Sequence, residues 1–192
     1  YTTVNENIGT HLSNFFPEEK EKRIKELLEV VELQKFGNTK VKLLSGGQKQ
    51  RVALAKAIAK KPEVILLDEP FSHIDNFKKQ SLRKNLFQFL KSEQIACIVA
   101  THDKDDVLAF ADQMLVLQSG KALLKGAPRV LFENPSHALI AAFFGDYCVL
   151  DGVIYYAHQI KLSEKGLIKA QVKHNYFRGT YYMIEAETDS QI

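Results

Sequence analysis

A glycine turn that opens a helix, followed by an apolar strand that ends in two acidic residues, constrains this chain more than any other feature. The turn is L-S-G-G-Q at residues 44–48, and the acidic pair is Asp68 and Glu69. Ser45 is a favoured N-cap residue, and residues 48–60 are good helix formers. A helix start offers unpaired N–H groups and a positive dipole end, so it suits a phosphate. A serine-capped surface helix is the alternative.

The apolar run 64–67 lies between Pro62 and Pro70, and it predicts a strand that is buried on both faces of a parallel sheet. Asp68 and Glu69 follow it directly. Ionised groups that leave water need partners, and in phosphate-transfer sites the first such carboxylate typically holds Mg²⁺ while the second deprotonates water. We therefore interpret Asp68 as a metal ligand and Glu69 as a general base. A solvated strand end is the alternative.

Four motifs together resemble those of the ATP-binding-cassette (ABC) ATPases. They are the signature motif at residues 44–55, the Walker B strand at 64–69, the D-loop Ser72-His73-Ile74-Asp75, and the switch histidine loop Thr101-His102-Asp103. Their order and rough spacings match those of the family. The resemblance implies an α/β fold: the carboxyl-terminal part of a P-loop NTPase with its helical subdomain, followed by a small β-rich extension.

The resemblance also implies a role for each site residue, because ABC ATPases pair two domains head to tail. Ser45, Gly46, Gly47 and Gln48 would bind the ATP that the opposite subunit holds, and Asp75 would couple the two sites. Asp68 would help to hold Mg²⁺, Glu69 would act on water, and His102 would sense the γ-phosphate. ATP and Mg²⁺ are thus the expected ligands.

The phosphate-cradling string G-x-x-x-x-G-K-[ST] does not occur anywhere in the 192 residues. Residues 3–7 match a T-V-x-E-N segment that comes shortly after the Q-loop in the family. We therefore expect the chain to start inside the ATPase domain. Without the P-loop lysine we expect it to bind ATP feebly and to be inactive alone.

An amphipathic helix is predicted from Pro17, with Ile24, Leu27 and Leu28 on one face, and it is expected to stop near Gly37. In the family this region meets the coupling helices of the membrane partner. An amphipathic helix that packs only on its own domain is the alternative.

A second long helix is predicted to begin at Asp75 or Asn76 and to end near Glu93. Its basic residues are interpreted as a solvated face: Lys78, Lys79, Arg83 and Lys84. Residues 95–100 then predict another buried strand. Because a strand, a helix and a strand give a parallel crossover, His102 is expected beside Asp68 and Glu69.

The pattern suggests three parts: a helical (signature) subdomain at 1–62, the carboxyl-terminal half of a RecA-like ATPase core at 63–145, and a β-rich extension at 146–192. Before the last part, a strand is expected at 114–118, a turn at Ser119-Gly120, and short helices that end at residues 133 and 144. Short β pieces are predicted at 152–156, 160–162, 167–174 and 180–186, with a hairpin loop before Gly166. The tail resembles the start of a TOBE-type barrel, and a small hairpin extension is the alternative.

Composition narrows the class of protein. The net charge is +3 and no basic stripe occurs, so a nucleic-acid partner is not expected. Cys97 and Cys148 lie far apart among apolar residues, which favours buried thiols in a reducing compartment over a disulfide. The longest apolar runs are shorter than the roughly 20 residues that span a bilayer. The resemblance to ABC ATPases implies a cytoplasmic protein, peripheral on the inner face of the cell membrane.

The leading hypothesis is the energy-coupling ATPase subunit of an importer for iron, polyamine, sulfate or sugar. Its partners would be transmembrane permease subunits and a second ATPase subunit. A soluble ABC ATPase that is not tied to transport is one alternative. A non-catalytic regulatory module that lacks the P-loop is another.

Overall fold

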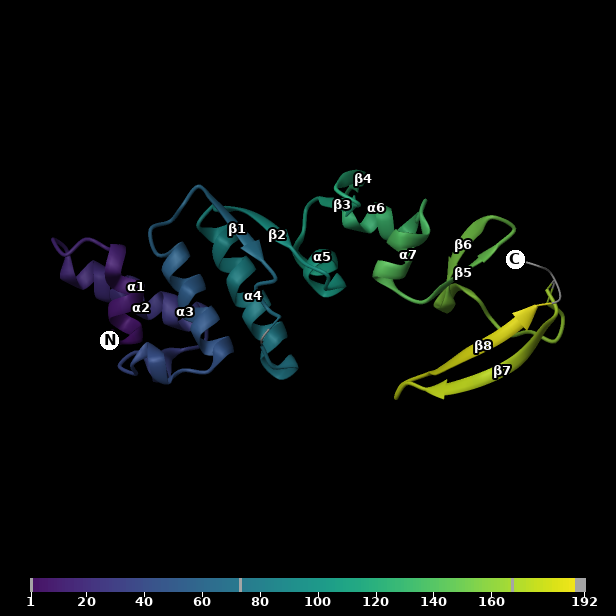
Figure 1. Ribbon diagram of the computed structural model, residues 1–192, viewed down its shortest axis with the longest axis horizontal. Coiled ribbons are helices and arrows are strands. Elements are labelled where there is room, and N and C mark those ends of the chain that lie inside the picture. Colours follow the sequence, from purple (N-terminus) through teal and green to yellow (C-terminus); the bar gives the residue numbers. More distant parts are fainter. Residues whose placement is uncertain (1, 73, 167, 189–192) are drawn as a thin grey trace. The chain divides into compact units, whose positions relative to one another are not determined.

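The computed structural model describes residues 2–72, 74–166 and 168–188 (Figure 1). The chain divides into two compact units, residues 1–110 and residues 111–192, and each is described by itself. His73 of the expected D-loop, Leu167 at the start of an expected strand, and residues 189–192 of the expected extension lie outside the described residues.

Short helices open the first unit. Thr3 caps α1 (Val4–Ile8) in a capping box with Glu6, and η1 (Gly9–His11) follows. The amphipathic helix α2 (Pro17–Val30) begins with proline in its first turn, as predicted. It ends earlier than the expected stop near Gly37, because Glu32 takes a left-handed conformation with φ 54°. Two 3₁₀ turns, η2 (Gln34–Phe36) and η3 (Val41–Leu43), lead to the glycine turn.

The helix that follows the glycine turn is α3 (Gly46–Ile58). Its inner face buries Val52, Ala55 and Ile58 in one cluster with the buried residues of α1 and α2. Arg51 is also buried, and its Nη1 donates to the carbonyl oxygens of Val31 at 3.0 Å and Glu32 at 3.2 Å. The guanidinium therefore satisfies carbonyl groups that the end of α2 leaves without helical partners.

A parallel crossover completes the first unit. β1 (Val64–Asp68) pairs in parallel with β2 (Ala96–Ala100), and α4 (Asn76–Ser92) connects them, as the sequence predicts. Asp75 stands at the N-cap position of α4 but makes no side-chain cap hydrogen bond there. α5 (Lys104–Phe110) closes the unit.

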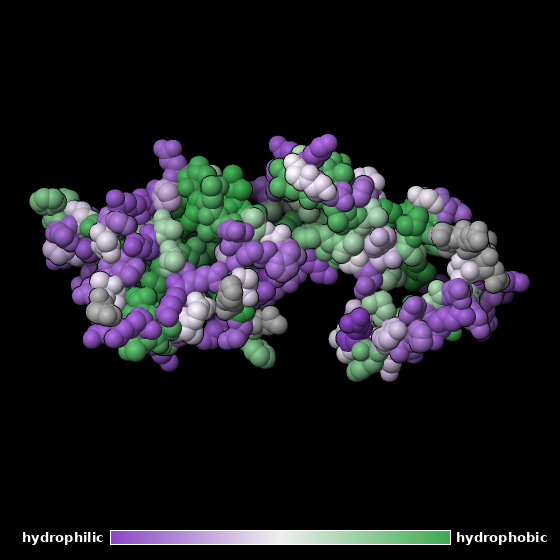
Figure 2. All heavy atoms as spheres, in the orientation of Figure 1, coloured by the Kyte–Doolittle hydropathy of each residue, from purple (hydrophilic) through white to green (hydrophobic). Residues whose placement is uncertain are grey.

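The prediction of a strand buried on both faces at 64–67 is wrong, and so is that of a second buried strand at 95–100. Ile65 lies in the core cluster, whereas Val64, Leu66 and Ile98 on the other face are 54%, 73% and 64% exposed. Figure 2 shows the resulting hydrophobic area over β1 and β2. The described residues of this unit cover only one face of the β1–β2 pair. An apolar run indicates that a strand can be buried, but it does not indicate which part of a protein covers each face.

The second unit is built from hairpins and short helices. β3 (Met114–Gln118) has its predicted bounds and pairs antiparallel with β4 (Lys121–Gly126). The expected turn at Ser119-Gly120 is confirmed, with φ 50° and 75°, which suits a tight hairpin. The two short helices are α6 (Pro128–Glu133) and α7 (Ala138–Phe144).

The tail contains two further hairpins. β5 (Tyr147–Leu150), which was not predicted, pairs with β6 (Val153–Tyr156), and β7 (Ala170–Phe177) pairs with β8 (Tyr182–Thr188). The strand expected at 160–162 is wrong, because η4 (Ala157–Gln159) and irregular chain occupy that stretch. The segment before Gly166 likewise joins no pair of strands described here.

Candidate functional site

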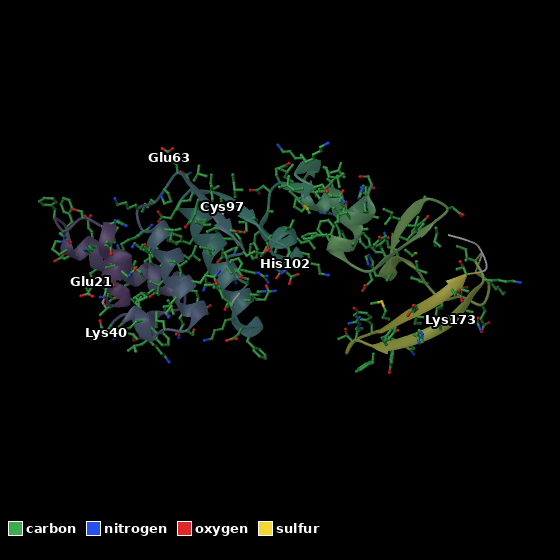
Figure 3. All side chains as sticks on the ribbon, viewed as in Figure 1. Glu21, Lys40, Glu63, Cys97, His102 and Lys173 are labelled. Atoms are coloured by element: carbon green, nitrogen blue, oxygen red, sulfur yellow. The ribbon has the colours of Figure 1, made fainter. Side chains whose placement is uncertain are left out.

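The carboxyl ends of β1 and β2 bring two expected site residues into contact. The register pairs Asp68 with Ala100, so both strands leave the sheet at one edge. His102 lies just beyond β2 (Figure 3), and its Nδ1 is 2.6 Å from Oε1 of Glu69. The expectation that His102 lies beside Glu69 is therefore confirmed. Asp68 lies exposed at the end of the same strand.

Glu69 has an unusual backbone. Its φ of 45° is in the left-handed region, which non-glycine residues adopt at a cost. Its N–H donates to the carbonyl of Ala100 at 2.9 Å and so extends the parallel ladder by one residue. Its carbonyl accepts from the N–H of Ser72 at 3.2 Å and from the Ser72 hydroxyl at 3.0 Å. These bonds hold the backbone of Glu69 and thus the direction of its Cα–Cβ bond, while the contact with His102 holds the carboxylate.

The turn at the start of α3 is open to solvent. The Ser45 hydroxyl accepts from the N–H of Gln48 at 3.3 Å, and the Gln48 carboxamide accepts from the N–H of Ser45 at 2.9 Å. Ser45 and Gly46 are exposed, and a Cβ at Gly46 would meet no atom within 4 Å. The packing of the chain itself therefore does not require glycine at residue 46. A ligand that approaches the backbone closely is a physical reason for one.

The D-loop region is linked electrostatically to α3. Burial lowers the pKa of the Arg51 guanidinium, and the negative charges of Glu32 and Asp75 act in the opposite direction. Asp75 is itself exposed. Asp75 thus lies within electrostatic reach of a buried arginine in the helix that the glycine turn begins.

The residues that flank His102 belong to a charge network that we call the Arg83 cluster, made of Arg83, Thr101, Asp103, Asp105 and Asp106, in which Arg83 and Asp106 are buried. Arg83 is 1% exposed and donates to carboxylate oxygens of Asp103 and Asp106. The Thr101 hydroxyl donates to Asp106 at 2.6 Å. The interpretation of Arg83 as part of a solvated face is therefore wrong, because the residues after His102 supply carboxylates that compensate its burial.

Asp103, the residue after His102, has a pKa that its surroundings lower. Burial raises the pKa of Asp103, but the backbone N–H of Asp105 and the Arg83 guanidinium together lower it below its ordinary value. Lys79 adds a further ion pair at 3.3 Å. The histidine loop is therefore fastened to α4 by charge.

Sequence reasoning missed Arg83 and also Gln50, whose side-chain amide reaches the carbonyl of Glu69. Gln50 lies inside the signature motif, and its membership of that motif was the sequence signal that could have marked it as a site residue. Cys97, by contrast, is no nucleophile candidate, because burial raises its pKa to about 11.

The donor set limits how a metal could be held. Among the described residues, no group of three or more His, Cys, Asp or Glu side chains could hold a metal ion. Mg²⁺ commonly binds through one or two carboxylates plus substrate phosphates. Asp68 fits that mode and does not fit a site made of protein ligands alone.

This chain is similar in sequence and in fold to ATP-binding domains of known proteins. The family profile described as ABC transporter matches residues 1–72. A dimeric bacterial ABC transporter cassette, MJ0796, is 30% identical with a TM-score of 0.57, and the match covers 66% of this chain and 56% of that one. The chain is therefore homologous to the ATP-binding domains of ABC transporters and has their P-loop NTPase fold.

Particular relatives are ATP-binding proteins of importers. The Fe(3+) ions import ATP-binding protein FbpC of Mannheimia succiniciproducens is 34% identical over 154 residues, which are 79% of this chain and 44% of the relative. The spermidine/putrescine import ATP-binding protein PotA of Oleidesulfovibrio alaskensis is 35% identical over 156 residues, 80% of this chain and 42% of the relative. The chain thus spans less than half the length of these relatives. In the part of the chain that the structure describes, no helix has the length and apolar character to cross a bilayer.

Proposed function

We propose that this chain carries the signature turn and the hydrolytic carboxylate of an ATP-hydrolysing energy-coupling subunit of an ABC importer. The observation that carries the proposal is the 2.6 Å contact between Glu69 and His102 at the ends of adjacent parallel strands. The exposed turn at Ser45 and the homology to ABC cassettes support it.

In this function Glu69 is the general base. Its carboxylate accepts a proton from the water whose oxygen attacks the γ-phosphorus of ATP, and ADP leaves with the bridging oxygen. His102 orients that carboxylate and would contact the γ-phosphate. Asp68 would hold Mg²⁺ together with phosphate oxygens. The metal supplies positive charge against the charge that develops on the transferred group.

The signature turn would serve a second ATPase subunit. Ser45, Gly46, Gly47 and Gln48 would bind the phosphates of ATP held by that subunit, since the start of α3 carries the positive end of the helix dipole. The capping box uses the N–H groups of Ser45 and Gln48, so the N–H groups of Gly46 and Gly47 would be the backbone donors. The open space beside Gly46 supports this role. Asp75, which interacts with Arg51 of α3, would couple the two sites.

The permease would dock on the surface around α2. A groove of 530 Å³ there is lined by Ile24 and Leu28 of α2 and by residues of α1 and η2. Phe15 and Phe16, on the loop before α2, are 91% and 61% exposed and supply apolar contact area beside it. In this proposal the subunit lies in the cytoplasm, on the inner face of the membrane. The names of the iron and spermidine/putrescine import relatives support iron or a polyamine as the transported solute.

The test combines the chain with the reading frame before Tyr1. The 192 residues alone should show no Mg²⁺-dependent ATP hydrolysis, because no P-loop string occurs in them. A P-loop and Q-loop in the preceding frame would support the proposal, and the longer product should then hydrolyse ATP. Glu69→Gln should lower that rate by about 10²–10⁴-fold.

Two outcomes would contradict parts of this proposal. Hydrolysis by a homogeneous sample of the 192 residues, lost on Glu69→Gln, would refute the claim that the chain is inactive alone. A start codon near Tyr1, with no P-loop before it, would instead favour a non-catalytic binding module.

A further inference from the structure

Gln50 joins the signature helix to the backbone of Glu69. Its Nε2 donates to the Glu69 carbonyl at 3.1 Å, across 19 residues of sequence. The other donors to that carbonyl come from Ser72, which is only three residues away. Gln50 is therefore the donor that connects a separate element, α3, to the turn that contains Glu69.

The bond has a direction that the surroundings impose. The Oε1 atom of Gln50 is buried and has no hydrogen-bond partner among the described residues. Exchanging the two ends of the amide would place Oε1 against the Glu69 carbonyl, so two acceptors would face each other. Nε2 must therefore face Glu69, even though the orientation leaves Oε1 unsatisfied.

The residue that receives this bond is the one whose backbone is strained. Glu69 has φ 45°, and such a conformation persists only where the surrounding contacts fix it. Its side chain meets His102 at 2.6 Å, so a small rotation of the backbone at residue 69 would move the carboxylate away from the imidazole. The three contacts on the Glu69 carbonyl and the bond from its N–H to Ala100 are what prevent that rotation.

We propose that Gln50 is a positioning residue that fixes the backbone of Glu69 and thereby ties the direction of its carboxylate to α3. The position of Gln50 is one turn into the helix that Ser45 caps. A displacement of α3 when its first turn receives a phosphate would thus reach Glu69 through a single hydrogen bond. The role of this hydrogen bond in coupling phosphate binding to Glu69 rests on the proposed function. The positioning of Glu69 by Gln50 does not.

The experiment is histidine-selective NMR on the 192-residue chain, without nucleotide. His102→Gln assigns the His102 ring signals, and Glu69→Gln defines their positions when the Glu69 contact is changed. Gln50→Leu lacks the donor and should move the His102 signals most of the way to those positions. The isosteric Gln50→Glu lacks the donor when its carboxylate is ionised and should then do the same. Gln88→Leu, on the exposed face of α4, is the matched control and should leave them unchanged.

Unchanged His102 signals in a folded Gln50 variant would overturn the proposal and leave Gln50 as a packing residue. If neither Gln50 variant folds, hydrogen exchange on the wild-type chain tests the proposal instead. The Gln50 side-chain N–H protons should exchange about fivefold or more slowly than those of exposed Gln88, and equal rates would overturn the proposal. Absence of ATPase activity in any longer product would refute the proposed function without changing these results.

Discussion

Replacing Arg83 with methionine removes the only cation among the five residues of the Arg83 cluster and keeps a long, flexible side chain in its place. The Arg83 side chain is 2% exposed and that of Asp106 is 4% exposed, so neither can regain full hydration by a small movement. Asp103, the other carboxylate that accepts from Arg83, is one quarter exposed and keeps its ion pair with Lys79. The loss therefore falls mainly on Asp106.

The magnitude follows from leaving one buried charge without its partner. Breaking a buried ion pair in this way costs about 3–5 kcal/mol. The hydroxyl of Thr101 still donates to Asp106, which favours the lower end of that range. We expect Arg83→Met to lower the free energy of unfolding of residues 1–110 by about 3 kcal/mol. With a urea dependence of about 1–3 kcal/mol per molar, the unfolding midpoint falls by roughly 1–3 M.

Urea titration with two optical signals measures this loss separately in the two units. The long helices α2, α3 and α4 all lie in residues 1–110, so far-ultraviolet circular dichroism follows mainly that unit. Six of the seven tyrosines lie beyond residue 110, so tyrosine fluorescence follows the other unit. In Arg83→Met we expect the urea midpoint from circular dichroism to fall and the midpoint from tyrosine fluorescence to stay unchanged.

Lys84→Met is the matched control, because Lys84 is the next residue of α4 and is exposed. It should change the free energy of unfolding by less than about 0.5 kcal/mol. The reasoning is refuted if Arg83→Met behaves like Lys84→Met, since the buried network would then contribute nothing to stability. A shift confined to tyrosine fluorescence would refute it as well.

Two further predictions use the same titration. Gly37→Ala places a Cβ 2.7 Å from Oδ1 of Asn5 and should cost residues 1–110 about 1–3 kcal/mol, whereas Gly46→Ala, whose Cβ meets no atom within 4 Å, should cost nothing measurable. Equal losses in the two variants would contradict this argument. The pKa of Asp103 is lowered from its ordinary value of 3.8, so its carboxylate stabilises the fold above that value and the stabilisation is lost as the pH falls through the folded-state pKa. The midpoint should thus fall more steeply below about pH 4 in the wild type than in Asp103→Asn, and parallel curves would argue against it.

Local sequence signals predicted most of the elements that position the site. The parallel crossover from β1 to β2 followed from two apolar runs separated by one helix, and it predicted the observed position of His102 beside Glu69. The strand Met114–Gln118 and its turn were predicted with the observed bounds. The hairpin turn depends on residues that are close in sequence. The contact between Glu69 and His102 joins residues 33 apart, and it was predictable because a strand, a helix and a strand form a parallel crossover of known geometry.

The burial of Arg83 and the exposure of the two parallel strands were not predicted. Arg83 was assigned to a solvated face because it stands in a basic run, yet it is spaced three and seven residues before Leu86 and Leu90, which are both buried. That spacing indicated the inner face of α4. The sequence also could not show that Val64, Leu66 and Ile98 are exposed, because what covers a strand depends on the rest of the assembly.

The four strand pairs of the described chain differ in when they can form during synthesis. β3 with β4, β5 with β6, and β7 with β8 are each neighbours in sequence, so each hairpin can close as soon as it leaves the ribosome. β1 must wait for β2, because Asp68 pairs with Ala100. At about 5–20 residues per second, β1 stays without its partner for roughly 2–7 s, long enough for a chaperone to bind it.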